Sequence, residues 1–415
     1  MLILALQKGY KMSDTMKEWE IKLLAVFVTL TIFVMRFSLT KGLLMNGFLL
    51  LLCIFRFCFL RKQVPLLSDD IKGYSKAFAV YFICIVPSIV FSDLPINSFL
   101  RLFFSLFQYG CFVAIILLIR HRKYLIGMLS AFFLFSGFDC LWTLVQLVGK
   151  HTLDNRGYGF GIKPLFIADI MCMLLPIALV ILMDMRFASE IKLRKSAAFA
   201  TLGIVIGLLC NKSRGAWLTQ LIVVPFICYR YFKQNRKYLA VFVLVILGMV
   251  GYMVSNPQYV ERIYSITNFT TDRSNADRIW TWKSAKLMIQ DYPLTGTGFG
   301  LFADVYVKGY KFEQETQNLT QTHNNFIQVT VETGVIGIMG FLYFIGYSLY
   351  TSLTNYRKER NPYDLLIFVI FLAHVCLFGQ IDSTIWNSGM QPFFLFLMAI
   401  LLCLKAADEN RSILG

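Results

Sequence analysis

The chain has 415 residues, of which 57% are hydrophobic and only 15% are charged, and its mean hydropathy is +0.62. About a quarter of the residues in a soluble domain are charged, so this composition excludes a water-soluble globular protein and indicates that most of the chain lies in lipid. The net charge of +16 does not indicate nucleic-acid binding, because the basic residues lie mainly in short connections between apolar runs.

The first apolar run begins near Ile21, after a segment that contains Lys8, Lys11 and Lys17. No small-residue cleavage site follows it, so we expect an uncleaved insertion signal. A helix needs about 20 apolar residues to cross the hydrocarbon core. Twelve runs fit this requirement, near 21–37, 42–60, 74–92, 98–119, 125–148, 164–183, 196–211, 216–232, 238–254, 326–350, 364–382 and 388–404. The predicted fold class is all-α, a polytopic membrane helix bundle of about 12 transmembrane helices.

The basic residues predict how these helices are oriented. Lys and Arg cluster in alternate connections, at 61–76, 120–123, 186–195, 230–237 and 357–360, whereas the connections 93–97 and 383–389 have none. Because cytoplasmic loops are rich in Lys and Arg, both termini are predicted to be cytoplasmic. The chain then divides into nine helices (1–254), a large, partly helical loop on the far side (255–325), and three helices with a cytoplasmic tail (326–415).

Ten cysteines are present, most of them inside apolar runs and none in the long loop. Their spacing is not that of a zinc site. We interpret them as small buried hydrophobic residues.

The long loop is predicted to contain one helix and one tight turn. Ser274-Asn275-Ala276-Asp277 matches a capping box with Ser274 as N-cap, which places Asp277 and Arg278 in the first turn of a helix that ends near Gln290. The stretch 293–300, Pro-Leu-Thr-Gly-Thr-Gly-Phe-Gly, follows. No strand precedes it and no Lys-Ser/Thr follows, so we interpret it as a turn back to the membrane and not as a nucleotide-binding loop.

Two arginines on the predicted far face are candidates for binding an anion. Arg214 lies in Ser213-Arg214-Gly215, between two apolar runs that could also form one broken pair. Its guanidinium group can either reach for the interface or hold two phosphate oxygens with its planar fork. Arg278 would add a full charge at the positive end of the loop helix, although taken alone it fits an ordinary solvated arginine better.

One of the four histidines lies where a proton acceptor would be useful. His323 stands in Gln-Thr-His-Asn-Asn, directly before an apolar run and so at the membrane boundary. An imidazole there could take a proton from an attacking hydroxyl group. His121 lies in a basic turn and His151 in the loop after the fifth span, while His374 lies inside a span and is expected to pack against or bond a neighbouring helix.

Glu313 and Glu315 form the only closely spaced acidic pair in the long loop. A metal-dependent transferase would need paired carboxylates near a diphosphate, but this pair lies in a polar run and is expected to be solvated. Cationic side chains would then offset the charge of a phosphorylated substrate.

Taken together, these motifs resemble the O-antigen ligases. His323-Asn324, nine further residues and Gly334-Val335-Ile336-Gly337 match the H-N/S-x9-G-x-x-G pattern of that family, and Glu332-Thr333-Gly334 is also similar. The Ser-Arg-Gly turn at 213–215 resembles another family motif, and Asp277-Arg278 with the glycine-rich turn resembles the opening of the family's large periplasmic loop. The resemblance covers residues 150–390 and leaves the first five spans without a recognised motif.

The resemblance implies a multi-pass enzyme of a Gram-negative inner membrane whose active site faces the periplasm. The family transfers polysaccharide from undecaprenyl diphosphate to a sugar of the lipid A core, without a metal, ATP or another cofactor. By residue match, His323 would be the general base, and Arg214 and Arg278 would hold the diphosphate. Arg156, in Asn-Arg-Gly-Tyr-Gly, sits where related enzymes carry another basic loop residue, but its match is looser.

Asn324 and Asp382 would support this machinery. Asp382 lies at the outer end of the eleventh predicted span, where it could orient His323 or the acceptor. With the arginines on the departing diphosphate and the base on the opposite face of the sugar, inversion at the anomeric carbon is expected.

Other functions stay open at this point. An O-antigen polymerase shares the donor and the architecture and differs only in the His-Asn-x9 motif, and a protein O-glycosylating relative shares that motif as well. A transporter or flippase for lipid-linked sugars would place charged residues inside its spans, for which Asp139, Asp169 and Asp184 are candidates. A far-side loop of this size is more than a carrier needs.

Overall fold

The computed structural model describes residues 16–59, 67–149, 156–161, 163–268, 272–315 and 318–414. Within these residues the chain forms helices and no strand, and ten helical segments are long and apolar enough to cross a membrane. The predicted all-α polytopic bundle is thereby confirmed, and the chain is a multi-pass membrane protein. Four sequence features lie outside the described residues: Lys8, Lys11, His151 and the basic pair 61–62.

Each of the twelve predicted spans corresponds to a helix or a run of joined helices. In chain order these are α1 (Glu18–Phe37), α2 (Leu39–Ile54) with η2 (Phe55–Phe59), α3 (Asp69–Val90), α4 (Pro95–Leu106) with η3 (Phe107–Tyr109) and α5 (Gly110–Leu118), α6 (Arg122–Gly149), α7 (Pro164–Met183), α8 (Ile191–Asn211), α9 (Arg214–Gln234), α10 (Arg236–Ser255), α14 (Asn325–Glu359), α15 (Pro362–Ile370) with η6 (Phe371–Leu377) and η7 (Phe378–Gln380), and α16 (Gln391–Leu414). A short helix η4 (Met185–Phe187) joins α7 to α8.

Two of the twelve, α1 and α9, are not among the ten apolar segments. Helix α1 begins with the charged residues Glu18, Glu20 and Lys22, and α9 carries Thr219 and Gln220 within its first two turns. These residues lower the apolar character of each helix without preventing it from forming.

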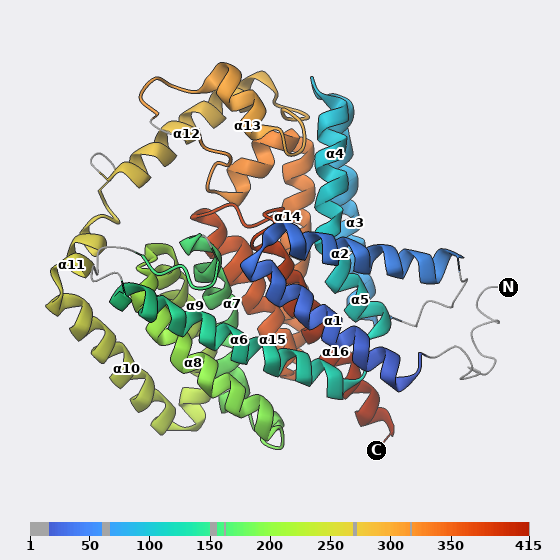
Figure 1. Ribbon diagram of the computed structural model, residues 1–415, viewed down its shortest axis with the longest axis vertical. Coiled ribbons are helices and arrows are strands. Elements are labelled where there is room, and N and C mark those ends of the chain that lie inside the picture. The colour runs from blue at the N-terminus through green and yellow to red at the C-terminus, as the bar shows by residue number, and fades with distance from the viewer. Residues whose placement is uncertain are drawn as a thin grey trace.

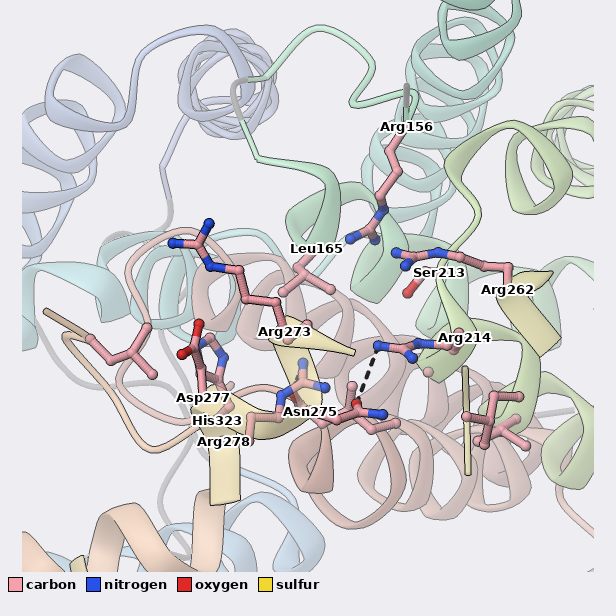
Figure 2. Close-up of a pocket in the computed structure, with 16 residues that line it drawn as sticks. Arg156, Leu165, Ser213, Arg214, Arg262, Arg273, Asn275, Asp277, Arg278 and His323 are labelled. Carbon is pink, nitrogen blue, oxygen red and sulfur yellow. Dashed lines mark hydrogen bonds between the residues drawn. The ribbon is translucent and has the colours of Figure 1, made fainter. Parts of the chain in front are cut away.

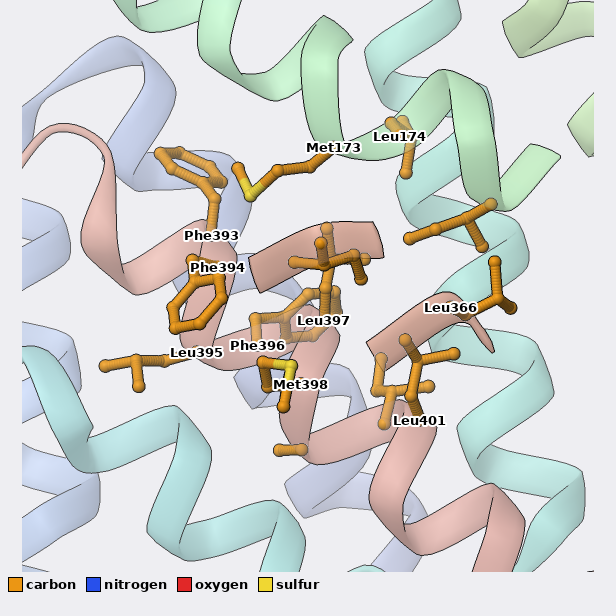
Figure 3. Close-up of a cluster of buried hydrophobic side chains, with 14 of the residues drawn as sticks. Met173, Leu174, Leu366, Phe393, Phe394, Leu395, Phe396, Leu397, Met398 and Leu401 are labelled. Atoms are coloured by element: carbon orange, nitrogen blue, oxygen red, sulfur yellow. The ribbon is translucent and has the colours of Figure 1, made fainter. Parts of the chain in front are cut away.

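Helices α7, α15 and α16 form the centre of the bundle, since most of each lies inside the protein, whereas α10 has nearly all of its surface on the outside. Figure 3 shows Phe393 and Leu397 of α16 beside Met173 of α7 and Leu366 of α15. In lipid, such side chains stabilise the bundle through close packing, because there is little hydrophobic driving force between helices.

Three carboxylates inside the bundle are each bonded to a second helix. The pairs are Asp139 with Arg36 (2.6 Å), Asp169 with His374 (2.9 Å) and Asp184 with Tyr231 (2.9 Å). The expectation that His374 bonds a neighbouring helix is confirmed, because Asp169 lies on α7 and His374 in η6. Buried charges in a membrane require such partners.

The long loop folds into a helical unit at one end of the molecule, and the C-terminus lies at the opposite end (Figure 1). Its elements are α11 (Pro257–Tyr264), α12 (Arg273–Asp291), α13 (Phe302–Val305) and the π-helix η5 (Tyr306–Tyr310). A small apolar cluster holds α12, α13 and η5 against α14, and it consists of Ala285, Met288, Phe302, Tyr306 and Val331.

Helix α12 forms as expected, but its predicted start is wrong. The N-cap is Asp272, not Ser274, because the Asp272 carboxylate accepts a hydrogen bond from the backbone N–H of Asn275 at 3.0 Å. Asp is as good a cap as Ser. Asp277 and Arg278 therefore lie in the second turn, and the residue at the positive end of the helix is Arg273.

The expectation of a solvated acidic pair is also wrong for Glu315. Glu313 is exposed, but Glu315 is buried and accepts hydrogen bonds from Ser284 (2.9 Å), Tyr306 and the backbone of Phe312 (3.0 Å). Its carboxylate ties α12 to η5 and so holds the loop unit together.

The glycine-rich turn at 293–298 returns the chain towards the membrane helix α14, as predicted. Its backbone also forms hydrogen bonds across a break in that helix. Gly334 has φ +61° and ψ −164°, so the helix is interrupted there. Four backbone hydrogen bonds join the turn to the break: Thr297 N to Val331 O (2.9 Å), Gly298 N to Glu332 O (3.1 Å), Val335 N to Pro293 O (2.9 Å) and Ile336 N to Leu294 O (3.2 Å). The loop unit is thereby fixed to the membrane helix that follows His323.

Candidate active site

A cavity of about 460 Å³ lies where the loop unit meets the membrane helices (Figure 2). Its volume is typical of sites for small ligands. It is lined by five guanidinium groups and one imidazole, from Arg156, Arg214, Arg262, Arg273, Arg278 and His323. Among the described residues that line the cavity, Asp277 is the one carboxylate, so this lining is strongly positive and suited to an anion.

Arg214 is the first residue of α9 and joins this helix to the loop unit. Ser213 caps the helix, and the Arg214 guanidinium donates to Ser265 O (2.7 Å), to both Asp272 oxygens (3.3 Å each) and to Asn275 Oδ1 (3.3 Å). Its side chain is only 11% exposed, so Arg214 does not extend to the membrane interface as a simple anchor would. The group is held in one orientation at the wall of the cavity.

Gly215 lets the turn at 381–383 pack against the start of α9, beside the cavity. A Cβ at Gly215 would lie 2.7 Å from Ile381 Cδ1, so only glycine lets the 381–383 turn come this close. The carbonyl of Ile381 in turn accepts a hydrogen bond from Arg278 Nη2 at 3.0 Å.

Arg278 is a half-buried cation whose Nε is buried. Its Nε has no hydrogen-bond partner within the described part of the chain. Burial lowers its pKa, and the charges of Arg214 and Arg262 contribute to the same shift. An unsatisfied buried N–H carries a desolvation penalty of about 1–3 kcal/mol, which a ligand oxygen would remove.

Arg156 and Arg262 complete the positive wall. Burial lowers the pKa of Arg156 to about 10, with further lowering from the neighbouring arginines, of which Arg262 has the largest effect. The pKa of Arg262 is lowered as well, first by burial and then by Arg214. Arg156 is positioned by its Nε, which donates to the carbonyl of Asn211 at 3.0 Å. These cations repel one another, so an anion bound among them would be strongly favoured.

His323 adopts a left-handed backbone conformation (φ +56°) directly before α14. Its Nδ1 lies 2.8 Å from Asp382 Oδ1, and the Asp382 side chain is only 2% exposed. Gln321 Nε2 and the backbone N–H of Ser383 donate to the same oxygen. In the neutral imidazole, a proton on Nδ1 leaves the lone pair on Nε2, which is the arrangement of a general base.

Asn324 has mainly a structural position. Its side chain caps α14 by accepting from the backbone of Phe326 and Ile327 (2.9 and 3.1 Å), and its Nδ2 donates to Gln380 Oε1 at 2.7 Å. Asn325 is buried and bonds Thr384. Both asparagines tie the start of α14 to the 380–384 segment that carries Asp382.

The structure thus brings four predicted residues, Arg156, Arg214, Arg278 and His323, to one cavity and places Asp382 behind the imidazole. Two further lining residues, Arg262 and Arg273, were not singled out from the sequence. Both lie in short polar stretches where nothing distinguishes them from solvated arginines. Helix α11 places Arg262 beside Arg156 and Arg214, whereas Arg273, the first residue of α12, lines the cavity with an exposed side chain (Figure 2).

Comparison with known proteins agrees with the expected family. Residues 198–342 match the family model described as O-antigen ligase; this stretch contains Arg214, Arg262, Arg278 and His323 but neither Arg156 nor Asp382. The resemblance to O-antigen ligases is therefore confirmed.

Three curated proteins are similar to this chain over part of its length. A Haemophilus influenzae protein described as "Uncharacterized protein" is 20% identical over 230 residues, which cover 50% of this chain and 56% of that protein. Proteins described as "Putative polysaccharide ligase" are 26% identical over 171 residues in Rickettsia conorii and 25% identical over 169 residues in Rickettsia bellii, covering 40% of each chain. The chain spans about half or less of the length of these relatives.

Proposed function

We propose that this protein is a glycosyltransferase that ligates O-antigen polysaccharide from undecaprenyl diphosphate to a sugar of the lipid A core. The observation that carries the proposal is the convergence of a histidine–aspartate pair and five arginines on one cavity at the end of the membrane helices. A diphosphate attached to a lipid can enter such a cavity while its tail stays in the bilayer.

The arginines bind the donor. Arg156, Arg214 and Arg262 form one side of the cavity, and Arg278 adds, from α12, an Nε–H that has no partner among the described residues (Figure 2). As the sugar–phosphate bond breaks, negative charge grows on the diphosphate. Fixed cations stabilise this charge more in the transition state than in the ground state, which is the requirement for catalysis.

His323 activates the acceptor. Asp382 fixes the ring through Nδ1 and stabilises the imidazolium that forms when Nε2 removes the proton from the attacking hydroxyl. The acceptor oxygen forms a bond to the anomeric carbon as the bond to the diphosphate breaks on the other side. The product is therefore inverted at this carbon, and lipid diphosphate is released.

The proposed orientation follows from the charged connections. The loop unit and the cavity face the periplasm, and both termini face the cytoplasm of a Gram-negative cell, because basic connections favour the cytoplasmic side. The division into 1–254, 255–325 and 326–415 belongs to this proposal. The carboxylates of Asp139, Asp169 and Asp184 already have protein partners, which favours a structural role over a transport path.

The decisive test uses the purified full chain in detergent with lipid-linked polysaccharide, rough lipopolysaccharide and EDTA. Polysaccharide attached to the lipid A core, together with free lipid diphosphate, is expected. Because detergent micelles have no two compartments, product formation would exclude a purely transporting protein. Absence of product with both substrates, while the donor binds, would contradict the proposal.

A deletion strain separates the ligase from its nearest relatives. A ligase deletion should leave lipid-linked polysaccharide of full length and a lipid A core without O-antigen. If long chains disappear and single repeats are still attached to the core, the protein is a polymerase. Loss of glycan from periplasmic proteins alone would identify a protein-glycosylating enzyme.

A further inference from the structure

A second cavity, of about 590 Å³, lies at the other end of the bundle, between α9, α14 and α15. Arg230 lies 16 positions after Arg214 on α9, which corresponds to about 24 Å at 1.5 Å per residue. This distance is close to the thickness of the hydrocarbon core. If the first cavity lies at one membrane surface, the second therefore lies at the headgroup level of the opposite leaflet.

Three cations surround this second cavity: Arg230, Lys233 and Arg360. Within the described residues, none of the three forms an ion pair with a carboxylate. Arg230 instead donates to the Tyr356 hydroxyl (3.1 Å) and to the carbonyl of Arg360 (3.5 Å). The nearby carboxylate of Asp184 accepts from the hydroxyl of Tyr231. The cluster therefore carries an excess of positive charge.

The remaining wall of the cavity is apolar and opens towards lipid. Phe226 and Tyr229 are exposed on the outer face of α9 (46% and 66%), while Ile227 and Leu365 are buried beneath them. A soluble anion could interact only with the three cations of this cavity. A molecule with a charged head and a hydrocarbon tail would use both walls.

We propose that this cavity binds the phosphate headgroup of an anionic membrane phospholipid, with an acyl chain along the exposed side chains of Phe226 and Tyr229. Arg230 and Arg360 can each offer a planar fork to the phosphate oxygens, and Lys233 adds a third charge. Basic pockets between membrane helices at this surface bind such headgroups. A lipid bound here would hold the far end of α9, whose other end carries Arg214.

Binding is tested with the purified full chain by thermal unfolding and native mass spectrometry. Phosphatidylglycerol is expected to raise the melting temperature and to stay bound in the gas phase. Phosphatidylcholine should do so much less, and glycerol phosphate at equal concentration should have no effect. Equal effects of the two lipids would overturn the role of charge, and an equal effect of glycerol phosphate would identify a site for a soluble phosphate.

Substitutions locate the site. The double variant Lys233→Gln/Arg360→Gln changes two exposed side chains and should weaken phosphatidylglycerol binding about tenfold or more, because each cation near the surface attracts anionic lipid. Lys237→Gln/Lys358→Gln is the matched control, since both lysines are exposed at the same end and outside the cavity. Normal binding in the first variant, or equal loss in both, would overturn the proposal.

Discussion

Replacing Asp382 with asparagine removes one charge and changes almost nothing else. In the described part of the chain, the hydrogen-bond donors to this side chain come from His323, Gln321 and the Ser383 backbone, and all three use Oδ1. An asparagine oxygen can take its place. The shape of the site is therefore kept. The loss that bears on proton transfer is the ability to stabilise a positive imidazole, and the same charge also attracts the guanidinium groups of Arg278 and Arg156.

The magnitude follows from the contact itself. A hydrogen bond to a charged group contributes about 1.5–3 kcal/mol and a neutral one about 1 kcal/mol, so the loss expected from this contact alone is about 0.5–2 kcal/mol. Two charges about 4 Å apart interact by about 4 kcal/mol at an effective dielectric constant of 20, which sets the upper limit. Because 1.36 kcal/mol is a factor of ten in rate, Asp382→Asn should lower kcat about 2- to 1,000-fold with little change in KM for the donor.

The assay measures polysaccharide transfer to rough lipopolysaccharide at several donor concentrations. Asp304→Asn is the control, because it removes the same charge from the loop unit at a residue that does not line the cavity. If Asp382 acts only through His323, then His323→Ala/Asp382→Asn should be no slower than His323→Ala alone. Wild-type kcat in Asp382→Asn, or additive losses in the double variant, would refute this reasoning.

Three further substitutions test the rest of the site and its support. Arg214→Lys should lower kcat/KM about tenfold or more, because an ammonium group cannot make the bidentate contacts of the guanidinium; unchanged transfer kinetics would reduce Arg214 to a structural role. The lowered pKa values of Arg156 and Arg262 mean that their charged forms destabilise the folded protein, for Arg156 at every pH below about 10. Arg262→Gln should therefore raise the melting temperature without donor and raise KM for the donor, and a lower melting temperature with normal KM would contradict this sign. Gly334→Ala should cost about 2 kcal/mol or more, since φ is +61° and a Cβ would lie 2.3 Å from the Leu294 backbone; thermal unfolding measures it, and Gly346→Ala, where a Cβ meets nothing within 4 Å, is the control.

The membrane helices could be predicted from the sequence because one physical requirement dominates them. Each run of about 20 apolar residues must satisfy its own backbone in lipid and therefore forms a helix. All twelve predicted runs are helical, and the boundary at Asn211–Arg214 is a break between α8 and α9 and not a continuous span. Charges at the start of α1 and polar residues in α9 changed how apolar these helices are, not whether they form.

The loop unit was less predictable, because its structure depends on contacts between distant residues. The N-cap of α12 is Asp272 and not Ser274, and the Asp272 carboxylate also accepts a hydrogen bond from Arg214, which lies 58 positions earlier in the chain. Glu315 looks solvated among polar neighbours, yet residues on α12 and η5 supply its donors. Local patterns carry no information about such partners.

Only part of the candidate site could be predicted from the sequence, again because local patterns do not show contacts between distant residues. His323 and Arg214 stand in short motifs beside apolar runs, so their sequence context indicates a membrane boundary. Arg262 has no such context, and its inward position results from how α11 packs beside α9. The backbone hydrogen bonds between the glycine-rich turn and the break at Gly334 could not be predicted from the sequence either, because a motif does not show which distant segment will pair with it.

The central claim is that His323 removes the proton of the acceptor hydroxyl while the arginines hold the diphosphate. The most direct measurement compares wild type and His323→Ala for donor binding and for transfer in the same purified preparation. The variant should bind lipid-linked donor with wild-type affinity, unfold at the wild-type temperature and form no product. Substantial transfer by His323→Ala would remove the base from the mechanism and contradict the account.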